Sequence, residues 1–327
     1  MTPRENLLNF FHGKPYEWIP SNLDTRPFQP TLMVENKARG FVDQQNPIPP
    51  EQFGGIDWFG VNWVYDPNCR GSIETKCLLD DPDDLLDWEE KIRFPDLSQM
   101  DWEGCRRENA EYLDTDLLLT TTIFTGYFER LIAFVGFENA AMALVEDDLK
   151  EAVHRLFDRL TDFYIDIARR FHEYYGVDYI TVHDDWGTQR SLMFSADVHR
   201  EMIMPYIRKL TDAVHSMGML YEQHSCGLIE ELIPNLIETG ADTWRGQPVN
   251  DKEKLVRMYG DRFKFIVDAS IPPHIECTDD EALACLAKNL SIYENKEVYY
   301  FLLPSSSPEL KAKYHDLLLK TTQERKS

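Results

Sequence analysis

DYITVH (residues 178–183) and LYEQHSC (residues 220–226) are two short β-like runs that enclose an amphipathic helical run. Ser195 is a favourable N-cap for the start of this helix, and Gly218 stands where a C-cap glycine belongs. Pro205 lies inside the helical run and is expected to kink it. The pattern predicts a strand, a helix and a second strand in succession, which is the repeating unit of parallel α/β folds.

The same alternation extends in both directions along the chain. Longer amphipathic runs separate the β-like runs, such as residues 228–239 and a C-terminal run from Ser307 to about Thr321. Eight strands alternating with helices predict a single (β/α)8 TIM barrel over residues 1–327, in which residues 1–56 hold an N-terminal extension and the first strand. The eight β-like runs are Glu17–Leu23, Asp57–Tyr65, Leu117–Ile123, Asp178–His183, Leu220–Cys226, Asp242–Gln247, Phe263–Asp268 and Val298–Leu303.

An open doubly wound sheet is the alternative fold for such a pattern. That fold places a glycine-rich phosphate-binding loop after its first strand. The corresponding stretch here, SNLDTRPFQP at residues 21–30, contains no glycine. The sequence therefore favours the closed barrel over the open sheet.

The composition excludes several classes of partner. Lys and Arg number 34 against 57 Asp and Glu, which gives a formal charge of −23. Such a chain repels phosphate backbones and anionic membrane surfaces, so we expect neither nucleic acid nor a membrane as partner. No apolar run approaches the roughly 18 residues needed to span a bilayer, and the polar N-terminal stretch does not resemble a signal peptide. With six scattered cysteines and no CxxC pair, we expect a reduced, cytoplasmic protein.

In a barrel, the side chains that carry chemistry lie at the carboxyl ends of the strands. His183, Asp184 and Asp185 end the fourth predicted strand, where a carboxylate could act as general base or substrate anchor. Adjacent acids at such a place could equally be solvated loop residues. Further candidates for substrate binding at the strand ends are Asn22, Asp24, Trp186, Gln189, Trp244, Gln247 and Asp268.

Glu222, His224 and Cys226 lie on one face of the fifth predicted strand, because side chains alternate along a strand. If that face points into the barrel, three potential metal ligands converge at its mouth. A soft thiolate beside an imidazole favours Zn²⁺ over Mg²⁺ or Ca²⁺. The same pattern is also compatible with an ordinary buried strand that contains two small, semi-polar core residues.

Three separated segments resemble the uroporphyrinogen decarboxylase superfamily, and they agree with it in order. They are TPRENLLNFFHGKPYEWIP at residues 2–20, GYFERLIAFVGFENAAMALVEDD at residues 126–148, and the run from VHDDWGTQRS to ETGADTW at residues 182–244. The resemblance covers nearly the whole chain and implies a single (β/α)8 barrel. It leaves both a monomer and a homodimer open.

One branch of that superfamily decarboxylates the acetate side chains of uroporphyrinogen without metal or cofactor. Its members carry an arginine-rich signature just after the first strand, where this chain reads LDTRPFQP with Arg26 alone. An octa-anionic substrate is disfavoured by a single arginine on a chain of charge −23. Metal-free decarboxylation of a porphyrinogen or related carboxylate is therefore the alternative function, and a barrel that only binds a ligand is the third.

The other branch contains methyltransferases that work with corrinoid proteins, and these enzymes resemble this chain in the motif HxCG. The resemblance implies that His224 and Cys226 bind zinc, which acts as a Lewis acid. Thiol-methylating members complete the zinc site with a cysteine near the last strand, whereas FLLPSSSPEL at residues 301–310 contains none. Glu222 is our first choice for the third ligand. The alternatives are Gln247, Cys277 and His183, or a metal-free site in which His224 is a general acid.

Oxygen donors in place of a cysteine would make the metal harder, which suits activation of an ether oxygen better than of a thiol. We therefore predict an enzyme that removes a methyl group from a small methylated compound, such as a methoxylated aromatic, and passes it to the cobalt of a corrinoid protein. No cobalamin-binding DxHxxG motif occurs in the sequence, so a separate partner would carry the cobalamin. The predicted catalytic residues are His183, Asp184 and Asp185. Aromatic residues near the strand ends fit such a substrate: Trp58, Trp63, Tyr65, Phe124, Tyr127, Phe128, Trp186 and Trp244.

Overall fold

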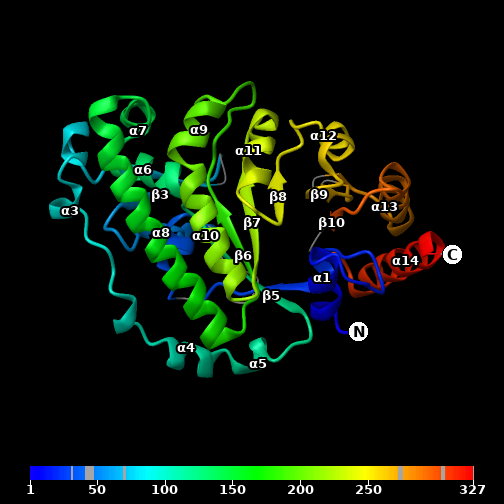
Figure 1. The fold of residues 1–327 in the computed structure, drawn as a ribbon. Helices are drawn as coiled ribbons and strands as arrows, with labels where there is room; N and C mark the ends of the chain where they lie inside the picture. Colours follow the sequence, from blue (N-terminus) through cyan, green and yellow to red (C-terminus); the bar gives the residue numbers. More distant parts are fainter. Residues whose placement is uncertain (31, 41–47, 69–70, 272–274, 303–305, 327) are drawn as a thin grey trace.

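The computed structural model describes residues 1–30, 32–40, 48–68, 71–271, 275–302 and 306–326. Its central feature is a parallel sheet of seven strands in the order β1-β5-β6-β7-β8-β9-β10 (Figure 1). A separate antiparallel sheet contains β2, β3 and β4. The parallel strands are β1 (Thr25–Pro27), β5 (Leu118–Ile123), β6 (Tyr179–His183), β7 (Leu220–Ser225), β8 (Thr243–Gly246), β9 (Lys264–Asp268) and β10 (Tyr299–Phe301).

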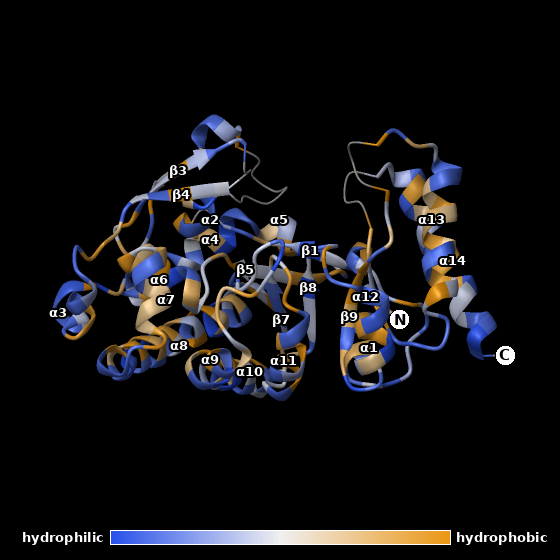
Figure 2. Ribbon diagram, turned by 90° about the horizontal axis from the view of Figure 1, so that it is seen from above, coloured by the Kyte–Doolittle hydropathy of each residue, from blue (hydrophilic) through white to orange (hydrophobic). Residues whose placement is uncertain are grey.

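Helices cover the outer face of the parallel sheet, and α8, α9, α10 and α11 lie side by side there (Figures 1 and 2). The long helix α8 buries an apolar stripe that includes Leu156, Leu160 and Ile167 in the main core. The helices are α1 (Pro3–Phe11), α2 (Val34–Ala38), α3 (Trp88–Lys91), α4 (Trp102–Glu108), α5 (Ala110–Leu113), α6 (Tyr127–Val135), α7 (Phe137–Ala143), α8 (Asp147–Tyr175), α9 (Ala196–Met202), α10 (Met204–Ser216), α11 (Ile233–Glu238), α12 (Lys252–Tyr259), α13 (Asp279–Ile292) and α14 (Pro308–Lys326).

The two edges of the parallel sheet are joined just before β1. Ser21 forms an isolated parallel bridge with Tyr300 of β10, and the Tyr300 amide donates to the Pro20 carbonyl at 3.2 Å. The Asn22 side chain adds two hydrogen bonds to the backbone of Leu302, at 2.9 and 2.7 Å. The described residues therefore form a curved seven-stranded sheet with bridged edges, and not the regular eight-stranded barrel predicted from the sequence.

The second predicted strand is wrong as a member of the parallel sheet. Residues 57–65 contribute instead to β3 (Asn62–Asp66), which lies between β2 (Gly54–Ile56) and β4 (Gly71–Lys76) in the antiparallel sheet. Trp63 of β3 is buried and its two neighbours in sequence are exposed, which is the alternation of a sheet with one buried face. The aromatic run predicted a strand correctly, but its one-sided burial placed it in a different sheet.

The first predicted strand is displaced towards the C-terminus. Ser21 caps a short 3-10 turn, η1 (Asn22–Asp24), because its hydroxyl accepts from the Leu23 amide and its own amide donates to Asp24. This turn delays the start of β1 to Thr25. The remaining six predicted strands are present as β5 to β10. Residue 303, the last of the predicted strand Val298–Leu303, lies outside the described residues, as do residues 304 and 305.

The helix predictions around residue 205 are confirmed in their main features. The Ser195 hydroxyl accepts from the Val198 amide and caps α9. The predicted kink is a break at Ile203, after which α10 begins with Pro205 in its first turn. The helix in the run 228–239 is shorter than predicted, since the run holds the 3-10 turn η5 (Glu230–Leu232) and then α11. The C-terminal helix continues to Lys326.

Helix α1 covers the amino end of the parallel sheet. Its Leu7 and Phe10 form an apolar cluster with Leu118, Tyr179 and Leu220, which start strands β5, β6 and β7. The amino ends of the strands are thereby packed. The carboxyl ends of β6 and β7, on the opposite side, are left to carry polar groups.

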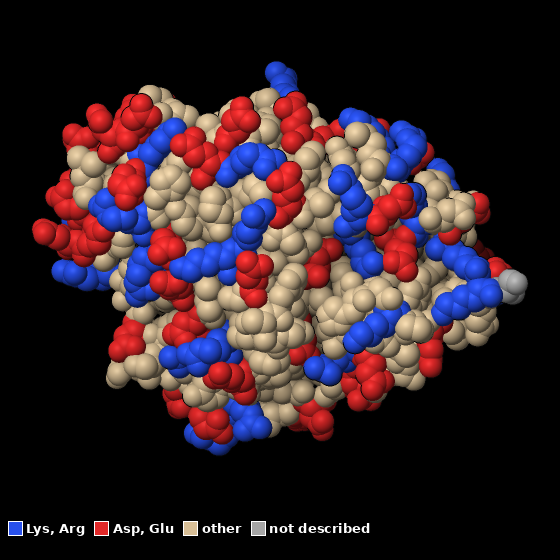
Figure 3. Space-filling view, in the orientation of Figure 1, with Lys and Arg blue, Asp and Glu red and all other residues tan. Residues whose placement is uncertain are grey.

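Charged side chains cover much of the surface. On the face shown in Figure 3, acidic and basic side chains are intermixed. Acidic residues outnumber basic ones in the sequence, 57 to 34. Some of them pair across neighbouring helices, as Lys150 does with Glu201 at 2.9 Å and Lys209 with Asp158 at 2.8 Å. None of the described helices is both long enough and apolar enough to cross a membrane.

Candidate metal centre

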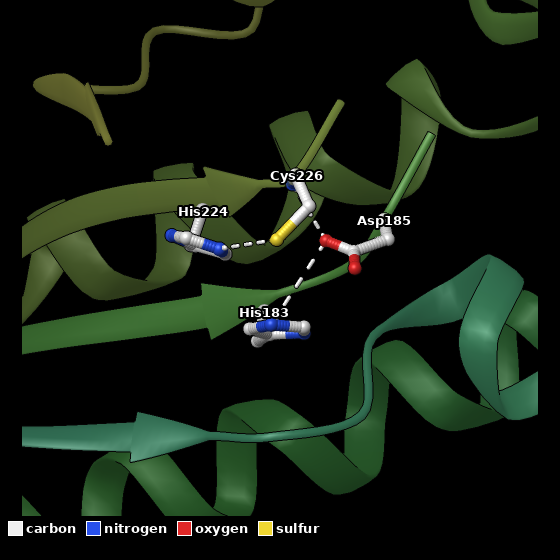
Figure 4. Close-up of side chains that lie close together, drawn as sticks. All are labelled: His183, Asp185, His224 and Cys226. Carbon is white, nitrogen blue, oxygen red and sulfur yellow. Dashed lines mark hydrogen bonds and ion pairs between the residues drawn. The ribbon is translucent and has the colours of Figure 1, made fainter. Parts of the chain in front are cut away.

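Four side chains with metal-binding atoms meet at the carboxyl ends of β6 and β7 (Figure 4). They are His183, Asp185, His224 and Cys226, here called the ligand group, and one ligand atom of each lies within 4.8 Å of the others. His183 and His224 are direct neighbours in the register of the two parallel strands. Their rings stack with centroids 4.6 Å apart and planes 18° apart. The strand pairing therefore sets the two imidazoles parallel to each other.

Cys226 and Asp185 complete the group from the loops that follow the two strands. The Cys226 sulfur lies 3.4 Å from His224 Nε2. The Cys226 amide donates to Asp185 Oδ1 at 2.6 Å, and the same oxygen lies 3.9 Å from His183 Nε2. These contacts fix both loops against each other and aim an oxygen, a sulfur and two nitrogens at one point.

Glu129, in the first turn of α6, orients His183. Its Oε2 lies 2.7 Å from His183 Nδ1, while its Oε1 accepts from the Arg39 guanidinium at 2.6 Å. This arrangement directs Nε2 of His183 into the ligand group, as carboxylate partners do for metal-binding histidines. Sequence reasoning missed both Glu129 and Arg39. Residue 129 falls within the resembling segment 126–148, but nothing in the local pattern separates it from other helical acids.

Burial and neighbouring charges give the two histidines opposite properties. Burial works against a charge on His183, but Glu129 outweighs it and raises the pKa of His183 to about 10. Burial, together with the adjacent His183, lowers the pKa of His224 well below its ordinary value. Burial also raises the pKa of the Cys226 thiol. Without a metal the group therefore holds protons on His183 and Cys226, and metal binding would release them.

The donor set fits zinc. Two imidazole nitrogens, one sulfur and one carboxylate oxygen are the ligand types that Zn²⁺ prefers, whereas Mg²⁺ and Ca²⁺ take oxygen alone. His224 Nδ1 is buried and finds no hydrogen-bond partner among the residues that the structure describes. Nε2 of His183 and Nε2 of His224 face the other members of the group and are the nitrogens that would bind a metal there.

Glu222, the first choice for the third ligand, lies outside the ligand group. It is on the same face of β7 as His224, but two residues nearer the amino end. Its carboxylate accepts from the Tyr179 hydroxyl and pairs with Arg245 Nε at 3.1 Å. Alternation along the strand therefore predicted correctly that Glu222 and His224 share a face of β7. It did not show that Glu222 lies too far from the carboxyl end of the strand to join the ligand group. The alternative candidate Cys277 is exposed and is not part of the group either.

Asp184 and Asp185 are adjacent in sequence and differ completely in environment. Asp184 accepts hydrogen bonds from the amides of Tyr127, Phe128 and Glu129, which open α6. Its carboxylate thus stabilises the amino end of that helix, and burial raises its pKa to about 7. Asp184 is therefore buried and engaged with the start of α6, whereas Asp185 faces the ligand group.

Trp186 and Trp244, predicted to bind substrate, are fully buried on the outer side of the sheet. Trp186 donates to Asp184 at 2.9 Å and packs edge-on against His199, with ring centroids 4.6 Å apart. Trp244 packs against Phe265 of β9. The other fully buried members of the predicted aromatic set are Trp63, Tyr127 and Phe128. Within that set it is Phe124 that lies beside the group, with its ring centroid 6.2 Å from that of His183.

The remaining predicted substrate residues lie in two places: at the carboxyl ends of the strands, and in the segment before β1. Gln189 donates to Gln247 at 2.6 Å, and the same Gln247 oxygen accepts from the Gly227 amide, so this pair borders Cys226. Asp268 is exposed at the end of β9. Asn22 and Asp24 instead hold the chain before β1: Asn22 binds Leu302, and Asp24 accepts from Trp18 and Ser21.

A cavity of about 1380 Å³, here called the central cavity, lies inside the curve of the parallel sheet. Thr181 and Glu222 contribute to its wall, and each precedes a histidine of the ligand group by two residues on the same strand face. The cavity therefore reaches to the level just below the ligand group. Other residues of its wall include Asn22, Asp24, Arg26, Thr122, Arg245, Tyr299 and Phe301.

Residues 128–265 match the family model described as uroporphyrinogen decarboxylase (URO-D). This region contains every member of the ligand group as well as strands β6 to β8. It confirms the resemblance to the uroporphyrinogen decarboxylase superfamily that the sequence predicted. No curated protein matches the chain.

Among solved structures, a methyltransferase from Methanosarcina mazei has the same fold, with a TM-score of 0.66, 15% identity and 99% of each chain covered. An Old Yellow Enzyme from Pichia sp. AKU4542 gives a TM-score of 0.41 at 9% identity and covers 66% of each chain. A family 2 AP endonuclease from Brucella melitensis gives 0.37 at 13% identity and covers 68% of this chain and 86% of its own. The similarity to the Methanosarcina mazei enzyme thus extends over nearly the full length of both chains.

Proposed function

We propose that the protein is a zinc-dependent methyltransferase that moves a methyl group between a small methylated substrate, such as a methoxylated aromatic, and the cobalt of a corrinoid protein. The observation that carries the proposal is the ligand group of His183, Asp185, His224 and Cys226 at the open end of the sheet. The full-length fold shared with the Methanosarcina mazei methyltransferase supports the same reaction class.

The sequence lacks a ligand cysteine near the last strand. In this proposal, residues at the end of β6 and just after it would provide the remaining ligands. In the proposed site, Asp185 supplies the oxygen that the sequence analysis assigned to Glu222, and His183 supplies a second nitrogen. Asp185 holds the Cys226 backbone through Oδ1 at 2.6 Å, which leaves lone pairs of the carboxylate directed at the group. A harder N₂OS donor set agrees with an ether oxygen as the atom to be activated.

Each residue of the site has a separate task in this proposal. Zinc bound by the ligand group would act as a Lewis acid on the heteroatom that carries the methyl group. Glu129 keeps His183 in the orientation and tautomer that direct its Nε2 into the ligand group, and Arg39 holds Glu129 in place. In such a transfer the electron pair of the broken C–O bond would stay on the substrate oxygen, and Co(I) of the partner would supply the electron pair of the new bond to the methyl group.

The decarboxylase alternative receives less support. Arg26, the single arginine after the first strand, donates to the Tyr112 carbonyl at 2.9 Å and lies over the Tyr112 ring. Part of its binding capacity is thus already used within the protein. A metal-free decarboxylase would also have no use for a thiol held 3.4 Å from an imidazole.

Metal analysis together with a cobalamin assay tests the proposal. The purified protein should contain close to one zinc per chain, and the Cys226→Ser variant should contain much less. With Co(I) cobalamin and a panel of methoxylated aromatics, the wild type should form methylcobalamin and the variant should not. Full activity in protein stripped of zinc, or decarboxylation of a porphyrinogen by such protein, would contradict the proposal.

A further inference from the structure

Arg245 occupies an unusual place on the inner face of β8. It is the register neighbour of His224, and its side chain is 35% exposed although it lines the central cavity. Its exposure is therefore towards the cavity. Interior positions of such sheets are normally filled by bulky apolar residues, so a guanidinium at this level calls for a partner.

The guanidinium is only partly satisfied within the protein. Its Nε pairs with Glu222 at 3.1 Å, and its central carbon lies 5.5 Å from the ring centroid of Phe301. Across the described part of the chain, its two terminal nitrogens have no hydrogen-bond acceptor, and they are not sealed from the cavity. The two terminal nitrogens of the Arg245 guanidinium are thus able to bind a ligand in the cavity.

A lysine lies near Arg245 without forming part of the cavity wall. Lys252 of α12 places its amine 3.5 Å from the ring centroid of Trp244, where the nitrogen is buried and finds no acceptor in the described ranges. Lys252 and Arg245 both interact electrostatically with Asp268 at the end of β9. Burial lowers the pKa of Lys252 to about 7, so its amine offsets only part of the negative charge of Glu222 and Asp268, and Arg245 is the cation of this group that lines the cavity.

We propose that Arg245 binds the carboxylate of the substrate in the central cavity, which makes the substrate class a small methoxylated carboxylic acid. A planar guanidinium fork matches a carboxylate in two parallel hydrogen bonds. The hydroxyls of Thr122 and Thr181 line the same cavity and can serve the rest of the ligand. With the acid group on Arg245, the body of the molecule would extend towards His224 and the rest of the ligand group.

This assignment rests on the proposed function for the methyl transfer, but the anion-binding step is measurable without cobalamin. Calorimetric titration of the zinc-loaded protein with 4-methoxybenzoate should show binding, and the neutral isostere 4-methoxybenzamide should bind at least roughly tenfold more weakly. Arg245→Gln should lower benzoate affinity by roughly tenfold or more and leave the weak amide binding unchanged. Arg26→Gln, at another part of the cavity wall, is the matched control and should keep the wild-type affinity.

The Arg245→Gln variant leaves Glu222 without its cation, so the Glu222→Gln/Arg245→Gln double variant is measured beside it and should show the same loss. Equal binding of acid and amide, or unchanged benzoate affinity in both variants, would overturn the proposal. Inorganic phosphate bound more tightly than benzoate, in an Arg245-dependent way, would also overturn it in favour of a phosphate site. Arg245-dependent benzoate binding without any methylcobalamin formation would refute the methyltransferase and leave the carboxylate site standing.

Discussion

Two adjacent residues of α6, Glu129 and Arg130, lead into two different buried charge networks. Arg130 pairs with Glu35 of α2 and with Asp57, and so ties the antiparallel sheet region to the parallel sheet. Glu129 pairs with Arg39 and His183 and so reaches the ligand group. One turn of α6 thus contributes both to the packing of the two sheets and to the ligand group.

The two networks differ in how charge is balanced. One guanidinium serves both Glu35 and Asp57, and burial raises the pKa of Glu35 to about 7. Glu129 is equally buried, but Arg39 and His183 outweigh the effect of burial and lower its pKa. The Arg130 network contains carboxylates and a guanidinium, whereas the Glu129 network ends on an imidazole beside a thiol. Buried charge by itself therefore does not mark a functional site, and the soft donor atoms do.

The largest expected effect is the loss of stability when the Arg130 network is broken. Arg130→Met should lower the free energy of unfolding by about 3–5 kcal/mol, because it leaves two buried carboxylates without their cation. Urea denaturation of the zinc-loaded protein measures this loss. Arg155→Met, which removes a surface pair with Glu89, is the control and should cost less than about 1 kcal/mol. Equal stability of the two variants would mean that the buried Arg130 network contributes no more than a surface ion pair.

The next effect belongs to the ligand group. His224→Ala should lower zinc affinity by more than about 100-fold, since it removes one of the four donors. Competition with a chromophoric chelator gives the affinity, and urea denaturation of the zinc-free protein should give nearly wild-type stability. If zinc binding survives the substitution, the metal lies elsewhere.

The Arg130 network should also leave a signature in the pH dependence of stability. The pKa of Glu35 is raised in the folded protein, so its stabilising contribution is complete below the unfolded pKa and is lost as pH rises through about 7. Glu35→Gln should remove about 2 kcal/mol of the fall in stability between roughly pH 5 and 8. Denaturation across this range measures the slope, and an unchanged slope would assign it to other groups.

The smallest effect expected is that of the residue that orients His183. Glu129→Gln keeps an oxygen near His183 Nδ1 but removes the charge, and should lower zinc affinity by roughly 10- to 100-fold. The loss should be smaller than that of His224→Ala under the same chelator competition. A loss as large as that of His224→Ala would mean that Glu129 does more than orient its neighbour.

The sequence predicted a good part of the site because the relevant signals are local. His224 and Cys226 share a strand-end motif, and His183 and Asp185 end the preceding strand, so all four were candidates before the fold was known. Strand order then brought them together, since consecutive parallel strands are neighbours here. The assignment of Glu222 failed because residues on one face differ in depth along the strand.

Other features depend on contacts between distant residues. Glu129 and His183 are 54 positions apart, and Arg39 and Glu129 are 90 apart, so no local pattern pairs them. The run at residues 57–65 has a strand-like pattern, but that pattern does not specify which sheet receives it. Burial on one face or on two decides the sheet, and it depends on what packs against the strand.

Asp184 and Asp185 show most clearly which features the sequence determined and which the tertiary structure decided. The sequence determined that a polar strand end would carry two carboxylates next to His183. The tertiary structure decided that Asp184 accepts from the amino end of α6 and that Asp185 meets Cys226. The alternation of side chains is a property of the extended backbone and ends with the strand at His183. Beyond that residue, direction is set by whichever donors the fold brings within reach.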